Sequence, residues 1–307
     1  MALLTLAEPD WRARQSAHEV RMDAYVQPHL ARGAAGQRHP VFDFLFTYYS
    51  HSPTQLRRWH PGYGVRLEGA AERASDKGYA DGTVTDEYVA GQLPLLRSLH
   101  SLLSATASRP GNFGCFGLHE WAMVYRLSED TTRHADWPLR LGPAATDAVV
   151  ESHRISCSHF DAFRFFTPRA RSLNLLQPGR DDRPAHEQPS CLHAGMDLYK
   201  HAFRLSPMVS SDLVADCFEL AWDIRVLDMR AAPYDLAPLG FDPVRIETAE
   251  GKRTYAEAQR GFAERGAPLR ARLIAECDRL IDALGASQGT ERLAPTMAHA
   301  QRSGRQT

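Results

Sequence analysis

The sequence predicts a mainly α fold, one helical domain over residues 1–285 with at most a small β element. Apolar residues recur at helical spacing in several long segments, whereas no series of strands alternating with helices and no internal repeat is found. Of the 307 residues, 43% are hydrophobic and 24% are charged, which is ordinary for a folded globular protein. A chain of this length can bury a substantial core.

The first half of the chain contains several segments that support this fold class. Residues 11–32 carry apolar side chains among charged ones, as an amphipathic helix does. Residues 65–69 alternate in hydrophobicity, which predicts a short strand. Thr85 starts a helix whose leucines continue at helical spacing to residue 106. Residues 115–125 are expected to be helical again.

The second half is expected to hold three more helices, over residues 187–204, 211–230 and 255–284. The short turn between the first two favours an antiparallel hairpin. Residues 137–141 are a candidate strand. Residues 286–307 lack hydrophobic periodicity and are rich in small and polar side chains, so we expect a disordered tail there.

Composition and cysteine usage exclude several classes of protein. The 36 Lys and Arg nearly balance the 37 Asp and Glu, so any nucleic-acid binding must come from a local basic patch. The five cysteines are scattered without a C-x-x-C pair, which excludes a disulfide framework and a structural zinc motif. No segment approaches the roughly 18 apolar residues of a membrane span. We therefore expect a cytoplasmic protein without a membrane partner.

The expected hairpin carries a polar stripe on each of its helices. His193, Asp197 and His201 recur four residues apart and therefore share one helix face. The second helix carries an acidic stripe that includes Glu219 and Asp223. Helical bundles bind metals with His and carboxylate side chains that project between facing helices, so this pattern predicts a divalent metal ion (Fe, Mn or Zn) on these five residues. Hydrogen-bonded polar packing and a solvated charged face remain open.

Two further polar pairs lie in apolar surroundings. His119 and Glu120 interrupt an apolar helix, and His159 and Asp161 lie among phenylalanines. A buried imidazole or carboxylate needs a partner. We therefore expect these four residues to line the same cavity as the hairpin, where they are the candidate catalytic residues. Ordinary hydrogen bonding in a helix or a loop remains the alternative.

Six segments, which cover most of residues 39–236, resemble a family from high-GC bacteria whose members are commonly labelled 3-methyladenine DNA glycosylase. These segments are HPVFDFLFTYYS, RRWHPG, GLHEWAMVYR, SHRISCSHFDAFRFFTP, CLHAGMDLYKHAFRLSP and LVADCFELAWDIRVLDMRAAPYDL. The resemblance implies an N-glycosidic-bond hydrolase of base-excision repair that releases alkylated purines such as 3-methyladenine from damaged DNA. It assigns no catalytic residue, because the helix-hairpin-helix and repeat patterns of other alkyl-base glycosylases are not found.

A glycosylase of this kind needs aromatic rings for the flipped base, a carboxylate for the sugar, and cations for the phosphates. Core packing is the alternative role for the aromatic residues. The candidates are Tyr48, Tyr49 and Trp59 for stacking, Arg57 and Arg58 for phosphate, and Asp161 or Glu120 for the carboxylate.

Two functions therefore remain open, and the glycosylase is placed first. The alternative is a metal-dependent enzyme, oxidative or hydrolytic, that acts on a small-molecule substrate at the His and carboxylate site between the helices. A non-catalytic helical binding protein is disfavoured, because many polar residues lie in apolar sequence and are expected to be buried.

Overall fold

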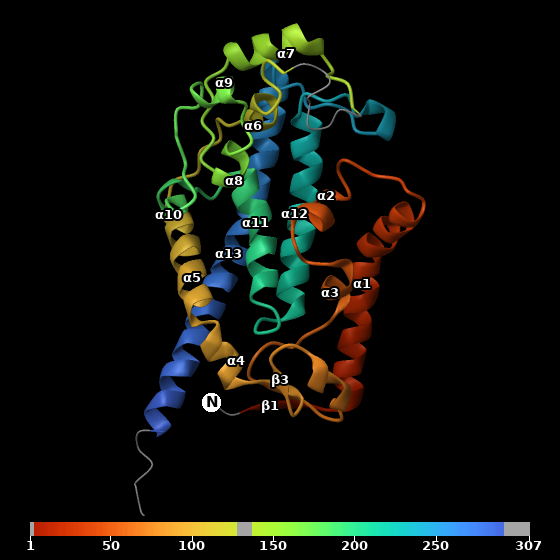
Figure 1. The fold of residues 1–307 in the computed structure, drawn as a ribbon, viewed down its shortest axis with the longest axis vertical. Coiled ribbons are helices and arrows are strands. Elements are labelled where there is room, and N and C mark those ends of the chain that lie inside the picture. Colours follow the sequence, from red (N-terminus) through yellow and green to blue (C-terminus); the bar gives the residue numbers. More distant parts are fainter. Residues whose placement is uncertain (1–2, 128–136, 292–307) are drawn as a thin grey trace, which may run out of the picture.

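A long helical hairpin forms the centre of the molecule. The computed structural model describes residues 3–127 and 137–291. Helices α11 (Leu192–Arg204) and α12 (Ser211–Ala231) run antiparallel side by side, and α13 (Ala249–Glu291) packs against both (Figure 1). Helix α1 (Glu8–Ala34) lies along the outer side of α12. The predicted antiparallel pairing of the two helices is confirmed.

Local sequence explains why the two hairpin helices start and pack as they do. The Ser210 hydroxyl accepts a hydrogen bond from the Leu213 N–H and so caps α12. Gly195 lets the helices approach closely, because a Cβ at this position would lie 2.7 Å from Cδ1 of Ile224. The apolar face of α11, with Met196 and Tyr199, is fully buried against α12. Burial of this face stabilises the pair more than helix propensity does.

Helices α4 (Asp86–Gly91) and α5 (Leu93–Ala107) pack on α13. The Thr85 side chain accepts a hydrogen bond from the Tyr88 N–H, as expected of a residue that starts a helix. Helix α13 contains Pro268 and extends to Glu291, beyond the expected domain boundary at residue 285. The rest of the predicted tail lies outside the described residues.

In the described part of the chain, the β-strands form two small sheets at one end of the molecule. Strand β1 (Leu4–Leu6) pairs in parallel with β2 (Val65–Leu67), and β3 (Tyr79–Ala80) pairs with β4 (Thr83–Val84) in antiparallel fashion. The predicted strand at residues 137–141 is reduced to one isolated bridge, Leu139 to Tyr234. The mainly α fold with a small β element is confirmed.

Short helices surround the hairpin and supply the walls of the site described below. At one end, α6, α7, α8 and α9 gather over the hairpin, while α2 lies beside α12 (Figure 1). Two 3-10 turns, Ala71–Ser75 and Ala237–Leu239, complete the described elements. The bounds of the short helices are α2 Phe44–Tyr48, α3 Pro53–Arg57, α6 Leu118–Ala122, α7 Gly142–Glu151, α8 Phe160–Phe163, α9 Pro168–Arg171 and α10 Arg183–His186.

One large core of buried side chains extends from Met22 in α1 to Leu284 in α13. A smaller core lies under the sheets, where Trp11, Trp59, Leu67 and Ala70 pack together. No helix among the described residues is both long enough and apolar enough to cross a membrane.

Candidate active site

A cavity of about 200 Å³ lies where α2, α6, α8, α11 and α12 meet, and we call it the site cavity. Aromatic rings and charged groups from distant parts of the chain share its surface. Pockets for drug-sized ligands are roughly 300–1,000 Å³, so this cavity suits a ligand of about one ring system. The lining residues are Phe44, Thr47, Tyr48, Glu120, Met123, Asp161, Phe165, His193 and Arg225.

Arg225 organises the inner end of the site cavity. Its guanidinium Nη1 lies 3.3 Å from Oε1 of Glu120 and 2.9 Å from Oδ2 of Asp228. The guanidinium also lies over the ring of Phe44, 3.8 Å from the ring centroid. All three charged groups are buried, so the arginine compensates two carboxylates that would be costly to bury alone.

His119 lies behind this group, with its Nε2 atom 3.0 Å from Oδ1 of Asp228. Burial disfavours a charged imidazole, but Asp228 outweighs burial and raises the pKa of His119 well above its usual value. Burial likewise opposes ionisation of Asp228, yet His119 and Arg225 hold the pKa of its carboxyl below the usual range. His193 packs edge-on against His119, and burial together with that neighbour lowers the pKa of His193 well below its usual value.

Asp161 lies at the outer part of the site cavity. Its Oδ2 accepts a hydrogen bond of 2.7 Å from Nζ of Lys200, and its Oδ1 lies 3.4 Å from Nε of Arg164. Burial raises the pKa of the Asp161 carboxyl, but the hydrogen bond and the charge of Lys200 outweigh burial and lower it. Asp161 is therefore ionised at neutral pH. Arg164 also donates to the hydroxyl of Tyr48.

A second buried network lies around His159. Its Nε2 atom is 3.4 Å from Asp197 and 3.4 Å from Glu187, and these carboxylates raise the pKa of the ring despite its burial. Arg183 bridges the same two carboxylates. The Tyr49 hydroxyl donates to Asp197 at 3.0 Å. This network joins α10 to α11 and to the segment after α2, so its role is to hold the walls of the site in place.

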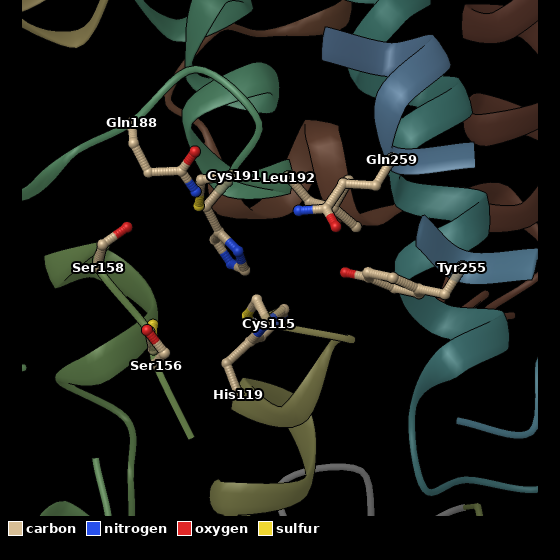
Figure 2. A pocket seen from close by; sticks show the side chains of 11 residues that line it. Cys115, His119, Ser156, Ser158, Gln188, Cys191, Leu192, Tyr255 and Gln259 are labelled. Carbon is tan, nitrogen blue, oxygen red and sulfur yellow. Dashed lines mark hydrogen bonds between the residues drawn. The ribbon is translucent and has the colours of Figure 1, made fainter. Parts of the chain in front are cut away.

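Beside the site cavity lies a much smaller pocket of about 10 Å³ (Figure 2). Its walls include the thiols of Cys115, Cys157 and Cys191 together with His119 and His193. In Figure 2 the hydroxyl of Tyr255 and the amide of Gln259 point into it from α13. A void of this size holds at most one water molecule, so it extends the polar network and does not accept a substrate.

The structure brings most of the expected catalytic residues together. Glu120 and Asp161 line the site cavity with His193, and His119 lies directly behind Glu120. Neither His119 nor His159 lines the site cavity, so the prediction is wrong for these two residues, and His159 belongs to the adjacent network. The segments that carry these residues therefore meet, as the sequence pattern indicates.

The predicted metal site between the hairpin helices is wrong for two of its five residues. Glu219 pairs with Arg21 of α1 at 2.6 Å, and Asp223 pairs with Arg265 of α13 at 2.6 Å. Both carboxylates lie on the outer side of α12, where cations from other helices compensate the acidic stripe. They do not face the stripe on α11.

The three α11 residues of that predicted site are buried, but they do not form a metal site with one another. Asp197 is already paired with Arg183 and Lys200. Burial lowers the pKa of His201 to about 3, so its ring is neutral, and its Nδ1 makes no hydrogen bond. His193 faces the site cavity instead.

The expected substrate-binding set is also corrected, because only Tyr48 of its five residues lines the site cavity. Tyr49 is 5% exposed and is held by Asp197. Trp59 is 2% exposed and packs in the small core with Trp11. These two rings are core residues and cannot stack on a base.

Arg57 and Arg58 line a separate surface groove of about 340 Å³, which we call the arginine groove. Arg57 pairs with Asp23 at 2.6 Å, and Arg58 pairs with Asp76 at 2.7 Å. The charge of each arginine is therefore compensated within the protein. The groove is lined by Arg12, Gln15, Glu19, Thr54, Arg57, Arg58, Trp59, Glu72, Arg73, Ser75 and Asp76.

The site contains residues that sequence analysis did not select. Arg225 and Asp228 lie on the buried face of α12, and Arg225 follows Phe218 by seven residues and Ala221 by four. Charged residues at the spacing of an apolar face are the signal that could have identified them. Phe44 and Phe165 carry no such signal, because an aromatic residue that lines a cavity has the same pattern as one in the core.

Comparisons with known proteins identify no relative. No protein-family model matches the chain, no curated protein is similar to it, and no solved structure matches its fold.

Proposed function

We propose that the chain is a DNA glycosylase that hydrolyses the N-glycosidic bond of alkylated purines such as 3-methyladenine, as an enzyme of base-excision repair. One observation carries the proposal. The site cavity combines aromatic rings with an ionised carboxylate, and it opens beside exposed arginines. These are the three kinds of group that a base-releasing enzyme needs.

The aromatic rings suit an alkylated base. An N3-alkylated adenine in DNA carries a positive charge, and cations bind well to the faces of aromatic rings. Phe44, Tyr48 and Phe165 line a cavity whose volume fits one base. Because Tyr48 and Phe165 are only half-buried and Thr47 is exposed, an extrahelical base can enter without opening the core.

Asp161 is the carboxylate best placed to act on the sugar. It lines the site cavity and is ionised at neutral pH because of Lys200. A fixed negative charge stabilises the positive charge that develops on the sugar as the bond to the base breaks, and it can accept a proton from the attacking water. The alkylated base leaves as a neutral molecule, so this reaction needs no general acid.

Arginines at the edge of the site cavity provide phosphate contacts. Arg164 donates to the hydroxyl of Tyr48, and Arg171 donates to the carbonyl oxygen of Arg164. Arg169 lies two residues before Arg171 on the same short helix, α9, and is exposed. Neither Arg169 nor Arg171 forms an ion pair with any carboxylate in the described part of the chain. Both are therefore available to neutralise DNA phosphates.

The test is release of 3-methyladenine from methylated duplex DNA by purified protein. Wild-type protein is expected to release the base, and Asp161→Asn is expected to lose at least about 100-fold in rate while it still binds the DNA. Asp223→Asn is the matched control, because it removes a carboxylate that pairs with Arg265 on the outer side of α12. This control is expected to keep the wild-type rate.

Two results would refute the proposal. One is wild-type protein that releases no more base than a protein-free sample. The other is an Asp161→Asn variant that is as fast as wild type.

A further inference from the structure

Two buried polar atoms, one on His119 and one on Asp228, face each other behind the site cavity without a normal hydrogen bond. Nε2 of His119 and Oδ1 of Asp228 are 3.0 Å apart, and their side chains are 3% and 0% exposed. Neither atom has a hydrogen-bond partner of acceptable geometry. Buried polar atoms are almost always paired, so this arrangement requires an explanation.

The spacing of these atoms is that of ligands around one metal ion. With bonds of about 2.1 Å to nitrogen and oxygen, two ligands are about 3.0 Å apart at a right angle and about 3.4 Å apart at the tetrahedral angle. A carboxylate oxygen of Glu120 completes a group of three donor atoms that all lie within 4.8 Å of one another.

Neighbouring groups orient the side chains of His119 and Asp228. In known metal sites, hydrogen-bond partners outside the ligands orient the ligands in the same way. Oδ2 of Asp228 accepts from Arg225 at 2.9 Å, which leaves Oδ1 directed at His119. On the far side of the imidazole ring, Sγ of Cys115 lies 4.0 Å from Nδ1. A proton on Nδ1 that points at this sulfur leaves the lone pair of His119 on Nε2.

The local charge also favours a cation. Glu120 and Asp228 carry two negative charges, and Arg225 supplies one positive charge. A metal-binding histidine must be neutral, and with His119 neutral one negative charge remains in this fully buried place, where an uncompensated charge is costly. A divalent ion that takes the place of the proton on His119 compensates this charge and leaves one positive charge for an anionic ligand or a hydroxide.

We propose that His119, Glu120 and Asp228 bind a divalent first-row transition ion at the inner end of the site cavity. One nitrogen and two carboxylate ligands suit manganese, iron or zinc. This site differs from the metal site that the sequence predicts between the hairpin helices. None of its three ligands belongs to the polar stripe of α11 or to the acidic stripe of α12. It does not depend on the glycosylase proposal.

The test uses Co²⁺ as a spectroscopic probe on protein first treated with a chelator. Wild-type protein is expected to bind one equivalent and to develop visible d–d absorption bands. Asp228→Asn and His119→Gln are expected to weaken this binding at least 10-fold. The controls are Glu219→Gln and His201→Gln, which change residues of the earlier predicted site and are expected to bind as wild type does. Circular dichroism of each variant shows whether it is folded.

A second measurement does not depend on variants. In crystals of the wild-type protein soaked in Co²⁺, anomalous scattering is expected to show a peak about 2.1 Å from Nε2 of His119. The proposal is overturned if wild-type protein takes up no stoichiometric Co²⁺, if folded His119→Gln protein binds it as tightly as wild type, or if the anomalous peak lies elsewhere.

Discussion

Nζ of Lys200 lies 2.7 Å from Oδ2 of Asp161, so a cation of α11 fixes the charge state of a carboxylate at the edge of the site cavity. Burial raises the pKa of the Asp161 carboxyl, and Lys200 more than offsets this effect. Lys200 also lies 3.5 Å from Asp197, which joins the site cavity to the buried network around His159. One lysine therefore couples the two polar clusters.

This pair predicts a specific dependence of stability on pH. The pKa of Asp161 is lower in the folded protein than its ordinary value of 3.8, so ionised Asp161 contributes stability above that ordinary value. The contribution is lost as the pH falls through the depressed pKa. In urea unfolding, the free-energy difference between wild type and Asp161→Asn should be largest near pH 7 and should shrink below pH about 4.

Lys200→Met provides the complementary measurement, because it leaves the Asp161 carboxyl without its principal cation. The pKa of that carboxyl, followed by carbon NMR of the side chain, should move upward in this variant. An unchanged pKa would show that Lys200 is not what holds it down.

The buried Arg225 should contribute far more to the free energy of unfolding than Arg265, a surface arginine that also pairs with a carboxylate. Arg225→Met leaves Glu120 and Asp228 buried without their shared cation, so we expect a loss of about 3–5 kcal/mol in the free energy of unfolding. Arg265→Met removes the partner of Asp223 at an exposed site, where the loss should be less than about 1 kcal/mol. Equal losses in the two variants would contradict the buried network.

The DNA contacts should lie on α9 and not in the arginine groove. An Arg169→Ala, Arg171→Ala double variant should bind duplex DNA more weakly, and the slope of log affinity against log salt should fall by about 1.8 if each arginine neutralises one phosphate. The matched double variant Arg57→Ala, Arg58→Ala changes arginines that already pair with Asp23 and Asp76. It should keep the wild-type slope, and the reverse pattern would move the DNA surface to the groove.

The hairpin could be predicted from sequence because its evidence is local. The spacing of His193, Asp197 and His201, the cap at Ser210 and the short turn all lie within the two helices and their connection. The sequence analysis did not select Arg225 and Asp228 on the inward face of α12, because the acidic stripe on the same helix has the pattern of a metal site. No lysine lies within that stripe, and its charge is compensated by Arg21 of α1 and Arg265 of α13, which are far away in the sequence.

The walls of the site cavity could not be predicted, because they depend on contacts between segments far apart in the chain. Phe44 lies under Arg225, and Tyr48 lies against Arg164. The aromatic segment after residue 39 was expected to stack on a ligand or to be buried, and the structure divides it between both roles. Tyr48 faces the cavity, whereas the next residue, Tyr49, points into the protein and donates to Asp197.

The central claim is that the site cavity is where an alkylated purine binds. Thr47→Trp tests it, because Thr47 is an exposed residue of the cavity lining and an indole there would fill the opening without replacing a core side chain. Thr54→Trp is the matched control, since Thr54 is an exposed threonine that lines the arginine groove.

The most direct measurement is calorimetric titration of free 3-methyladenine into wild type and these two variants. The account predicts one bound base per chain for wild type and Thr54→Trp, and at least 10-fold weaker binding for Thr47→Trp. Binding by Thr47→Trp that equals wild type, or no binding by the wild-type protein, would contradict it.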